Sequence, residues 1–228
     1  MHFNQSVNFQ QFGHSLFSVE RDNHLTFEAC AQTVCKRIYN SVKDENGESA
    51  FALVRIFRSS THQELPPEQN ETNTNGRWLS LMGTYGDEPA WCDRLQSQGH
   101  RVLPAGAFET PMLSAAFRQI DLDIDAYVKG IDLKPDFIKE TDEHYKYFHV
   151  IDAVGSPYIV VQDEFVRRYG IRSAVGFGLV LMSGAFYMCL AFSKITITKE
   201  MAEAYVRLSP YVSTVLASYE KRGVLWEK

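Results

Sequence analysis

The residue types that most often carry chemistry are spread thinly along this sequence. Cys30 and Cys35 are five positions apart in a stretch with helical periodicity, so their side chains diverge. His144 and His149 are also five apart, which in a strand places them on opposite faces. None of the C-x-x-C, H-x-x-x-H or H-E-x-x-H spacings of zinc sites occurs. We therefore predict no metal site and interpret both histidines as ordinary side chains, not as metal or haem ligands.

Asp121, Asp123 and Asp125 have the spacing of the first three ligands of a calcium loop. The sixth position of that loop lacks the required glycine and the twelfth lacks the glutamate, which argues against calcium. The alternation of apolar and acidic residues over 120–125 predicts a solvated strand edge instead.

Motifs for nucleophiles and phosphates are also missing. G-x-S-x-G, G-x-G-x-x-G and the P-loop pattern do not occur in the sequence. Gly176-x-Gly178 lies inside a strand pattern, where it predicts close packing and not phosphate binding. Cys92 could be a nucleophile, but no partner for it can be identified. We assign no catalytic residue and expect a protein that is not an enzyme.

The composition is that of an ordinary globular chain. Of 228 residues, 45% are hydrophobic and 22% charged, and the formal net charge is −5. The length fits one domain, and the acidic balance argues against nucleic-acid binding through bulk charge. The four cysteines, with no secretory leader, fit a reducing compartment, so we expect a cytoplasmic protein.

The run 173–193 contains no charged residue and is long enough to cross a bilayer. Ser183-Gly184 is a turn signal that divides the run into two stretches of strand length. Large and small side chains alternate mostly with the period of a strand, a sorting that a lipid-exposed helix does not require. We therefore predict a buried β-hairpin and no membrane association.

Periodicity and turn residues also predict the other elements. In chain order they are a helix at 25–42, a strand at 49–58, a polar loop at 59–76, a strand at 77–85, a short helix at 88–98, a helix from Thr110-Pro111, a strand at 144–154, a short helix at 163–169 closed by Gly170, and a final helix from Thr198.

The strand at 49–58 is apolar on both faces, which predicts a sheet covered on both sides. Strict alternation places Phe51, Leu53 and Phe57 on one face, and Ala52, Val54 and Ile56 on the other. Arg55 shares the Phe51 face, so we expect it either at the rim of the sheet or paired.

The final helix carries a seam of apolar residues with heptad-like spacing. Its members are Met201, Tyr205, Leu208, Val212, Val215 and Tyr219. The seam is either the packing face of an amphipathic helix on its own sheet or a dimer helix. Pro210 predicts a kink within it.

The order of these pieces in the C-terminal third resembles the closing half of a GAF domain. The resemblance is carried by a short helix, the entry Gly170-Ile171-Arg172-Ser173 into a strand, the turn Ser183-Gly184, a strand ending in Phe192-Ser193, and a helix opening over 198–200. It is strongest over 164–219, while the helix at 25–42 and the strand after it fit the start of the family.

The resemblance implies an α+β fold with a central antiparallel β-sheet. The N- and C-terminal helices would pack on one face, with loops and short helices over a ligand pocket on the other. A single GAF-like domain would span 25–221, with insertions at about 59–76 and 87–143, an N-terminal extension at 1–24 and a C-terminal tail at 222–228.

The resemblance also implies a non-catalytic, small-molecule sensing or regulatory domain of a signal-transduction protein. Such a domain would act as a homodimer through its terminal helices and feed an attached output domain, a kinase or another regulator. The cofactor stays open, because the N-K-F-D-E signature of cyclic-nucleotide binding and the Cys-His pair of bilin-carrying relatives are absent.

Two alternatives remain. The first is a redox enzyme like the free methionine sulfoxide reductases, for which Cys92 is the cysteine expected near the pocket. The second is a dimerisation module without a ligand. If the chain binds a ligand, as a sensor or as an enzyme, aromatic and polar side chains of the middle segment should line the pocket. The candidates are Tyr85, Trp91, Phe108, Tyr147, His149, Tyr158 and Arg172.

Overall fold

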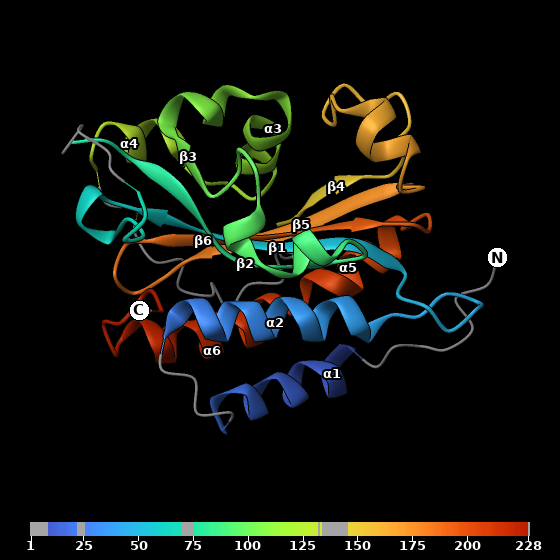
Figure 1. Cartoon of the computed structure of the whole chain (residues 1–228), viewed down its shortest axis with the longest axis horizontal. Coiled ribbons are helices and arrows are strands. Elements are labelled where there is room, and N and C mark those ends of the chain that lie inside the picture. Colours follow the sequence, from blue (N-terminus) through green and yellow to red (C-terminus); the bar gives the residue numbers. More distant parts are fainter. Residues whose placement is uncertain (1–8, 22–25, 70–74, 132, 134–145, 228) are drawn as a thin grey trace.

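The protein is built around a six-stranded antiparallel sheet with the strand order β3-β2-β1-β6-β5-β4 (Figure 1). The computed structural model describes residues 9–21, 26–69, 75–131, 133 and 146–227. The strands are β1 (Phe51–Ser60), β2 (Trp78–Gly86), β3 (Val102–Pro104), β4 (Phe148–Val150), β5 (Ser173–Val180) and β6 (Phe186–Ser193). Helices cover both faces of the sheet, so the expected α+β fold is confirmed.

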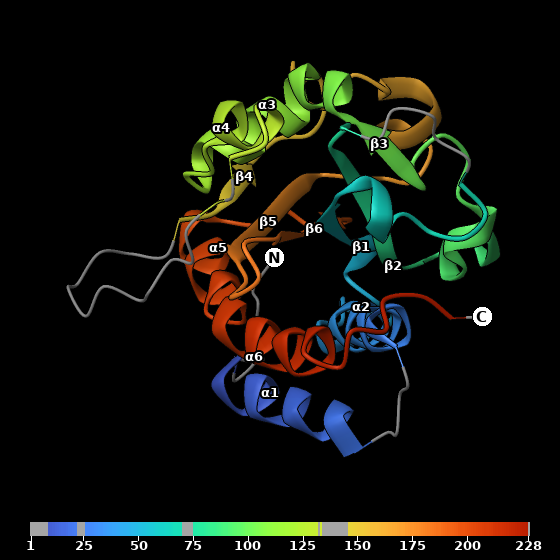
Figure 2. The same cartoon turned by 90° about the vertical axis from the view of Figure 1, so that its left-hand side faces the viewer.

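One face of the sheet is covered by α2 (Phe27–Ser41), α5 (Lys199–Val206) and α6 (Ser209–Glu220), and Figure 2 shows α1 (Phe9–Leu16) outside them. The α2 helix begins at Thr26, whose hydroxyl accepts a hydrogen bond from the Ala29 amide at 3.1 Å. Gly83 on β2 lets α2 approach closely, because a Cβ there would lie 2.6 Å from the Ala31 carbonyl. We call α1, α2, α5 and α6 together the helix layer.

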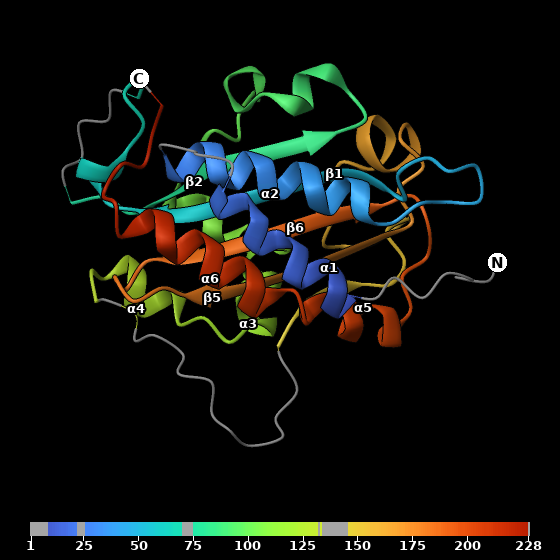
Figure 3. The ribbon, with the colours of Figure 1, turned by 90° about the horizontal axis from the view of Figure 1, so that it is seen from below.

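Both ends of the described chain join the helix layer. Figure 3 shows α1 running across α2 and α6, and Leu16 and Val19 are fully buried in the same core. The carbonyl oxygens of Val224 and Leu225 accept hydrogen bonds from the first amides of α2, each at 2.9 Å. Residues 9–21 and 224–227 thus pack within the helix layer, while the predicted domain bounds of 25 and 221 stay a prediction.

The heptad-like seam is the core face of the helix layer. Tyr205, Leu208, Val212, Val215 and Tyr219 are buried against the sheet and the neighbouring helices, and Met201 is half-buried beside them. These side chains are therefore not a dimer surface, because the chain itself covers them. The predicted single kinked helix is also wrong, since α5 and α6 are separate helices.

Pro210 accounts for that break. It lies in the first turn of α6, where a missing backbone N–H removes no helical hydrogen bond.

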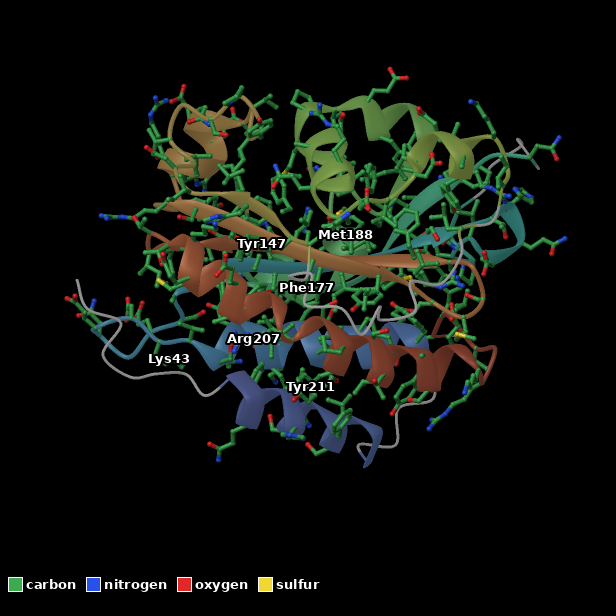
Figure 4. All side chains as sticks on the ribbon, turned by 180° about the vertical axis from the view of Figure 1, so that it is seen from behind. Lys43, Tyr147, Phe177, Met188, Arg207 and Tyr211 are labelled. Atoms are coloured by element: carbon green, nitrogen blue, oxygen red, sulfur yellow. The ribbon has the colours of Figure 1, made fainter. Side chains whose placement is uncertain are left out.

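The uncharged run forms the predicted hairpin of β5 and β6. Its turn is closed by the Leu181 amide bonding to the Ala185 carbonyl at 2.6 Å, and Gly184 has a φ of +86°. Figure 4 shows Phe177 on the helix-layer side of the sheet and Met188 on the opposite side, as strand alternation requires. Among the residues described, no helix is at once long enough and apolar enough to cross a bilayer.

Short elements cover the opposite face. They are 3-10 turns at Pro89–Cys92, Arg94–Gln96 and Ala105–Glu109, the helices α3 (Pro111–Gln119) and α4 (Ile124–Val128), and a π-helical turn at Gln162–Arg167. The predicted helix at 88–98 is thus two 3-10 turns. Of the predicted strand at 144–154, β4 forms three residues, and 144 and 145 lie outside the described residues.

The predicted strand edge at 120–125 is wrong, because this segment joins two helices. Asp121 has a φ of +61° at the end of α3. Asp123 caps α4, its carboxylate accepting a hydrogen bond from the Ala126 amide at 2.9 Å. Local hydrogen bonding by an acidic side chain therefore explains part of the alternation.

A bulge in β1 changes which side chains face the helix layer. Its register with β6 shifts between Phe51 and Leu53. Phe51 consequently joins Val54 and Ile56 on the helix side, while Ala52 joins Leu53 and Phe57 on the other. The predicted alternation is correct from Leu53 onward and wrong for the two residues before it.

Candidate functional site

A cavity of about 560 Å³ opens on the face of the sheet opposite the helix layer. Its floor is formed by Leu53 and Phe57 of β1 and by Leu190 and Phe192 of β6. Its walls come from 90–98, the start of α3, and 158–165, and Figure 1 shows α3 and the segment around 158–165 above the sheet. This volume is typical of small-molecule sites, and most of the lining side chains are apolar.

Arg55 is the polar feature of the cavity floor. It lies on β1 between Leu53 and Phe57 and lines the cavity with them. One terminal nitrogen of its guanidinium donates to the Ser97 hydroxyl at 3.3 Å, while the buried Nε has no hydrogen-bond partner. Burial lowers the pKa of Arg55 to about 10, so the guanidinium is still positively charged at neutral pH.

The other polar groups at this end of the cavity are neutral. Gln96 and Gln98 border it together with Ser97. His100 also lines it, and burial, followed by the nearby Arg55 charge, lowers the pKa of that imidazole. Among the described lining residues, Glu164 is the acidic one, and its side chain is exposed. The described lining of the cavity therefore combines apolar walls with one half-buried positive charge.

This architecture matches solved structures at low sequence identity. The GAF domain from a phosphoenolpyruvate-protein phosphotransferase (ptsP) from Coxiella burnetii is 11% identical, with a TM-score of 0.55 and coverage of 96% of this chain and 99% of that chain. The phycocyanobilin-bound GAF domain of a cyanobacterial phytochrome is 12% identical, with a TM-score of 0.50 and coverage of 95% and 97%. This chain has a GAF-domain fold.

A third match, fRMsr of Staphylococcus aureus in its reduced form, is 10% identical with a TM-score of 0.50, covering 95% of this chain and all of that chain. No protein-family model and no curated protein sequence matches the chain. The likeness therefore establishes the GAF fold, and the chemistry of the site must be argued from this chain's own residues.

Two of the seven predicted pocket residues line the cavity of this GAF fold. Trp91 lies on its wall, and its ring is 4.4 Å from that of Tyr169 and 5.8 Å from that of Phe165. Tyr158 lies on the segment that faces α3, with 37% of its surface exposed. Both reach the cavity from the segments that lie over the sheet, as the GAF resemblance implies.

Two other candidates lie on the helix-layer side of the sheet, so their prediction as pocket residues is wrong. The Tyr85 ring packs 5.1 Å from that of Tyr39 on α2. Tyr147 packs against the same core, and Figure 4 shows it beside the helix layer.

The remaining three do not line the cavity either, and His149 lies on the helix-layer side of β4, opposite Val175 of β5. Phe108 is buried in the apolar core beneath α3 and α4. The Nε2 atom of His149 lies 2.9 Å from the Ile197 carbonyl, and Arg172 is exposed at the start of β5. They were predicted by residue type, which does not reveal the face on which a side chain lies.

The four cysteines of this GAF fold do not form a pair at the cavity. Cys30, Cys35 and Cys189 are buried in the core of the helix layer, and burial raises the pKa of Cys35 and takes that of Cys189 to about 12. The Cys92 thiol lies 3.4 Å from the Gly86 carbonyl. Within the described chain, no three side chains of His, Cys, Asp or Glu converge on a metal position.

Arg55 and Ser97 are the site residues that the sequence analysis missed. One signal for Arg55 was present: it is a charged residue in the middle of an apolar strand of a sheet covered on both sides. Ser97 gave none, because it comes from an irregular segment 42 residues away that only the tertiary structure brings to β1.

Proposed function

We propose that this chain is a non-catalytic regulatory domain that binds a small molecule in the cavity over β1 and β6. The observation that carries the proposal is the cavity itself, which combines a preformed apolar enclosure with a small number of polar groups. The GAF domains it resembles in fold include one bound to phycocyanobilin, which supports the placement of a ligand on a domain of this architecture.

The test is to occlude the cavity without disturbing the core. Met112 lines the cavity from α3 and is only partly buried, so Met112→Trp should fill the space. Met182 is 68% exposed in the hairpin turn, and Met182→Trp adds the same side chain away from the cavity. We expect native mass spectrometry of protein purified from its source to show a bound small molecule. The Met112 variant should lose it and the Met182 variant should retain it.

Equal retention by both variants would place the ligand elsewhere and contradict the proposal. Absence of any bound molecule, together with no binding in a metabolite screen by calorimetry, would favour the ligand-free dimerisation module.

A redox enzyme is the second candidate, since fRMsr of Staphylococcus aureus shares the fold. The placement of the cysteines disfavours it: Cys92 sits next to the lining residue Trp91, while the other three are buried on the far side of the sheet. Turnover of free methionine sulfoxide by the parent, abolished in Cys92→Ser, would overturn the non-catalytic proposal. We expect no turnover in either protein.

We also propose that the domain acts as a dimer in a signalling protein, an expectation that comes from the family resemblance. The dimer surface cannot be the seam of α5 and α6, which the chain covers itself. In addition, α1 lies on α6, with the Tyr211 ring 5.2 Å from that of His14. Sedimentation velocity over a range of concentrations tests this part, and a persistent monomer would contradict it.

A further inference from the structure

The half-buried charge on the cavity floor restricts what the cavity can hold. Arg55 lies in β1, which β2 and β6 flank on both sides, so its backbone cannot move toward solvent without breaking the sheet. Its buried Nε has no hydrogen-bond partner, and among the described residues its one side-chain hydrogen bond is to the neutral Ser97 hydroxyl. Within the described residues no carboxylate forms an ion pair with it. A half-buried guanidinium in this condition is destabilising unless an anion reaches it.

We infer that the ligand of this cavity is a carboxylate with an apolar body, its carboxylate bound by Arg55 and the Ser97 hydroxyl. This inference rests on the proposed function and names the chemical class of its ligand. A guanidinium offers parallel N–H groups that match the two oxygens of a carboxylate, and the Arg55 side chain lines the cavity. The hydroxyl of Ser97 supplies a further donor at the same end.

The charge balance favours a single negative charge. Arg55 is the one cation among the described residues that line the cavity, and the groups near it are amides, a hydroxyl and an imidazole. A phosphate monoester would bring a second negative charge into an apolar cavity with no second cation to neutralise it. The acidic Glu164 lies exposed on the lining, so it also disfavours extra negative charge away from Arg55.

The walls determine the rest of the molecule. Trp91, Phe165 and Phe192 line the cavity together with leucines from β1 and β6. Phe165 and Phe192 pack edge to face at 5.0 Å, and Trp91 contacts Phe165 in turn. An aromatic or branched aliphatic body would bury its surface on these rings, while a strongly hydrated body would lose its water without compensation.

The experiment compares matched probes by titration calorimetry. Each aryl or alkyl carboxylate of about eight to twelve carbons, a size suited to this cavity, is paired with its primary amide and its phosphonate. We expect the wild type to bind carboxylates at least about tenfold more tightly than the amides, and more tightly than the phosphonates. In Arg55→Met this preference should disappear while the amides still bind.

Two further variants test whether the charge of Arg55 or the geometry of its donors determines the preference, and a third serves as a control. Arg55→Lys keeps the charge but not the fork of donors, so we expect part of the preference to remain. Ser97→Ala leaves Arg55 in place and should weaken carboxylates about threefold, in line with the loss of one hydrogen bond. Arg207→Met changes an exposed arginine in the helix layer, labelled in Figure 4, and should bind like the wild type.

The outcomes that overturn the inference are distinct from those that overturn the proposed function. Equal affinity of wild type for carboxylates and amides, or a carboxylate preference that survives in Arg55→Met, contradicts the role of Arg55. Tighter binding of phosphonates contradicts the single charge. In each of these cases the cavity still binds small molecules. Failure of every probe class to bind the wild type would instead contradict both.

Discussion

Arg55 and Arg58 are three positions apart on β1 and point to opposite faces of the sheet. Arg58 faces the helix layer, where its guanidinium donates to Glu64 at 2.8 Å and to Glu220 at 2.8 Å. Its side chain is only 3% exposed, and it lies 5.8 Å from the Phe27 ring. Arg55 faces the cavity and has one neutral side-chain partner.

The difference separates a structural charge from a charge held for a ligand. Among the described residues, two carboxylates pair with Arg58 in the core and none pairs with Arg55 at the edge of the cavity. Because a buried charge without a counter-ion lowers stability, such a residue is retained at a functional site more readily than in a core. Four changes test this comparison, from the largest expected effect to the smallest.

Arg58→Met should have the largest effect. It leaves two glutamates without their cation, and one of them, Glu220, is only 11% exposed. We expect the free energy of unfolding to fall by about 3–5 kcal/mol, the usual loss when one partner of a buried ion pair is removed. Urea denaturation measures it, with the exposed Arg207→Met as the control. A loss below about 1 kcal/mol would contradict the structural role.

A third arginine extends the comparison. Arg94 pairs with Glu28 and Glu68 and lies under the Trp226 ring, whose centroid is 4.7 Å from the guanidinium carbon. Trp226→Leu removes this cation–π contact and the indole hydrogen bond to the Glu64 carbonyl at 2.8 Å.

We expect Trp226→Leu to lower the free energy of unfolding by about 2 kcal/mol in urea denaturation. Trp226→Phe should recover part of this lost stability, since it keeps an aromatic ring near Arg94 but has no N–H to donate. An unchanged midpoint in the leucine variant would show that the contact contributes nothing.

Arg55→Met should change stability in the opposite direction. Replacing a half-buried guanidinium that no carboxylate of the described residues neutralises by an apolar chain of similar length should raise the free energy of unfolding by about 1 kcal/mol in the absence of ligand. The measurement is the same urea denaturation, on protein freed of small molecules. Destabilisation comparable to that of Arg58→Met would show that Arg55 is structural and would remove the contrast.

The smallest effect is a difference in the response to acid. Burial alone would raise the pKa of Glu64, but the charge and hydrogen bond of Arg58, together with hydrogen bonds from Thr61, outweigh it and lower that pKa below its usual value. A carboxyl whose pKa is lower in the folded state stabilises the fold above its unfolded pKa of about 4.5, and this stability is lost as the pH falls through the folded value.

Unfolding midpoints measured below about pH 4.5 should therefore fall in the wild type and in Arg55→Met, and fall less steeply in Glu64→Gln. Parallel pH profiles for wild type and Glu64→Gln would exclude the pair as a source of acid sensitivity.

The hairpin and most helices could be predicted because their signals are local. The strand period of 173–193 and the Ser183-Gly184 turn determine β5 and β6 without reference to the rest of the chain. The heptad-like seam of α5 and α6 was just as clear in the sequence. Its pattern alone could not decide between a helix packed on its own sheet and a dimer helix. A helix packed on its own sheet and a helix packed on a partner both bury one apolar stripe.

The cavity could not be predicted in the same way, because its walls come from irregular segments. The bulge in β1, which moves Phe51 to the helix side, left no mark on the sequence. In the segment at 94–98, Ser97 hydrogen-bonds to Arg55. Arg94 of the same segment pairs with Glu28 of α2. These contacts depend on tertiary structure, so residue type alone selected two of the lining side chains correctly.

The backbone hydrogen bonds between 224–225 and the start of α2 affect when each part of the chain can fold during synthesis. The amides of Phe27 and Glu28 find their acceptors nearly 200 residues later, so while the chain is still growing these donors can bond only to water. The first turn of α2 is therefore completed late on the ribosome, after both strands of the hairpin have emerged. The first helix against the sheet becomes fully capped only when residues 224 and 225 are available, and such distant closure slows folding.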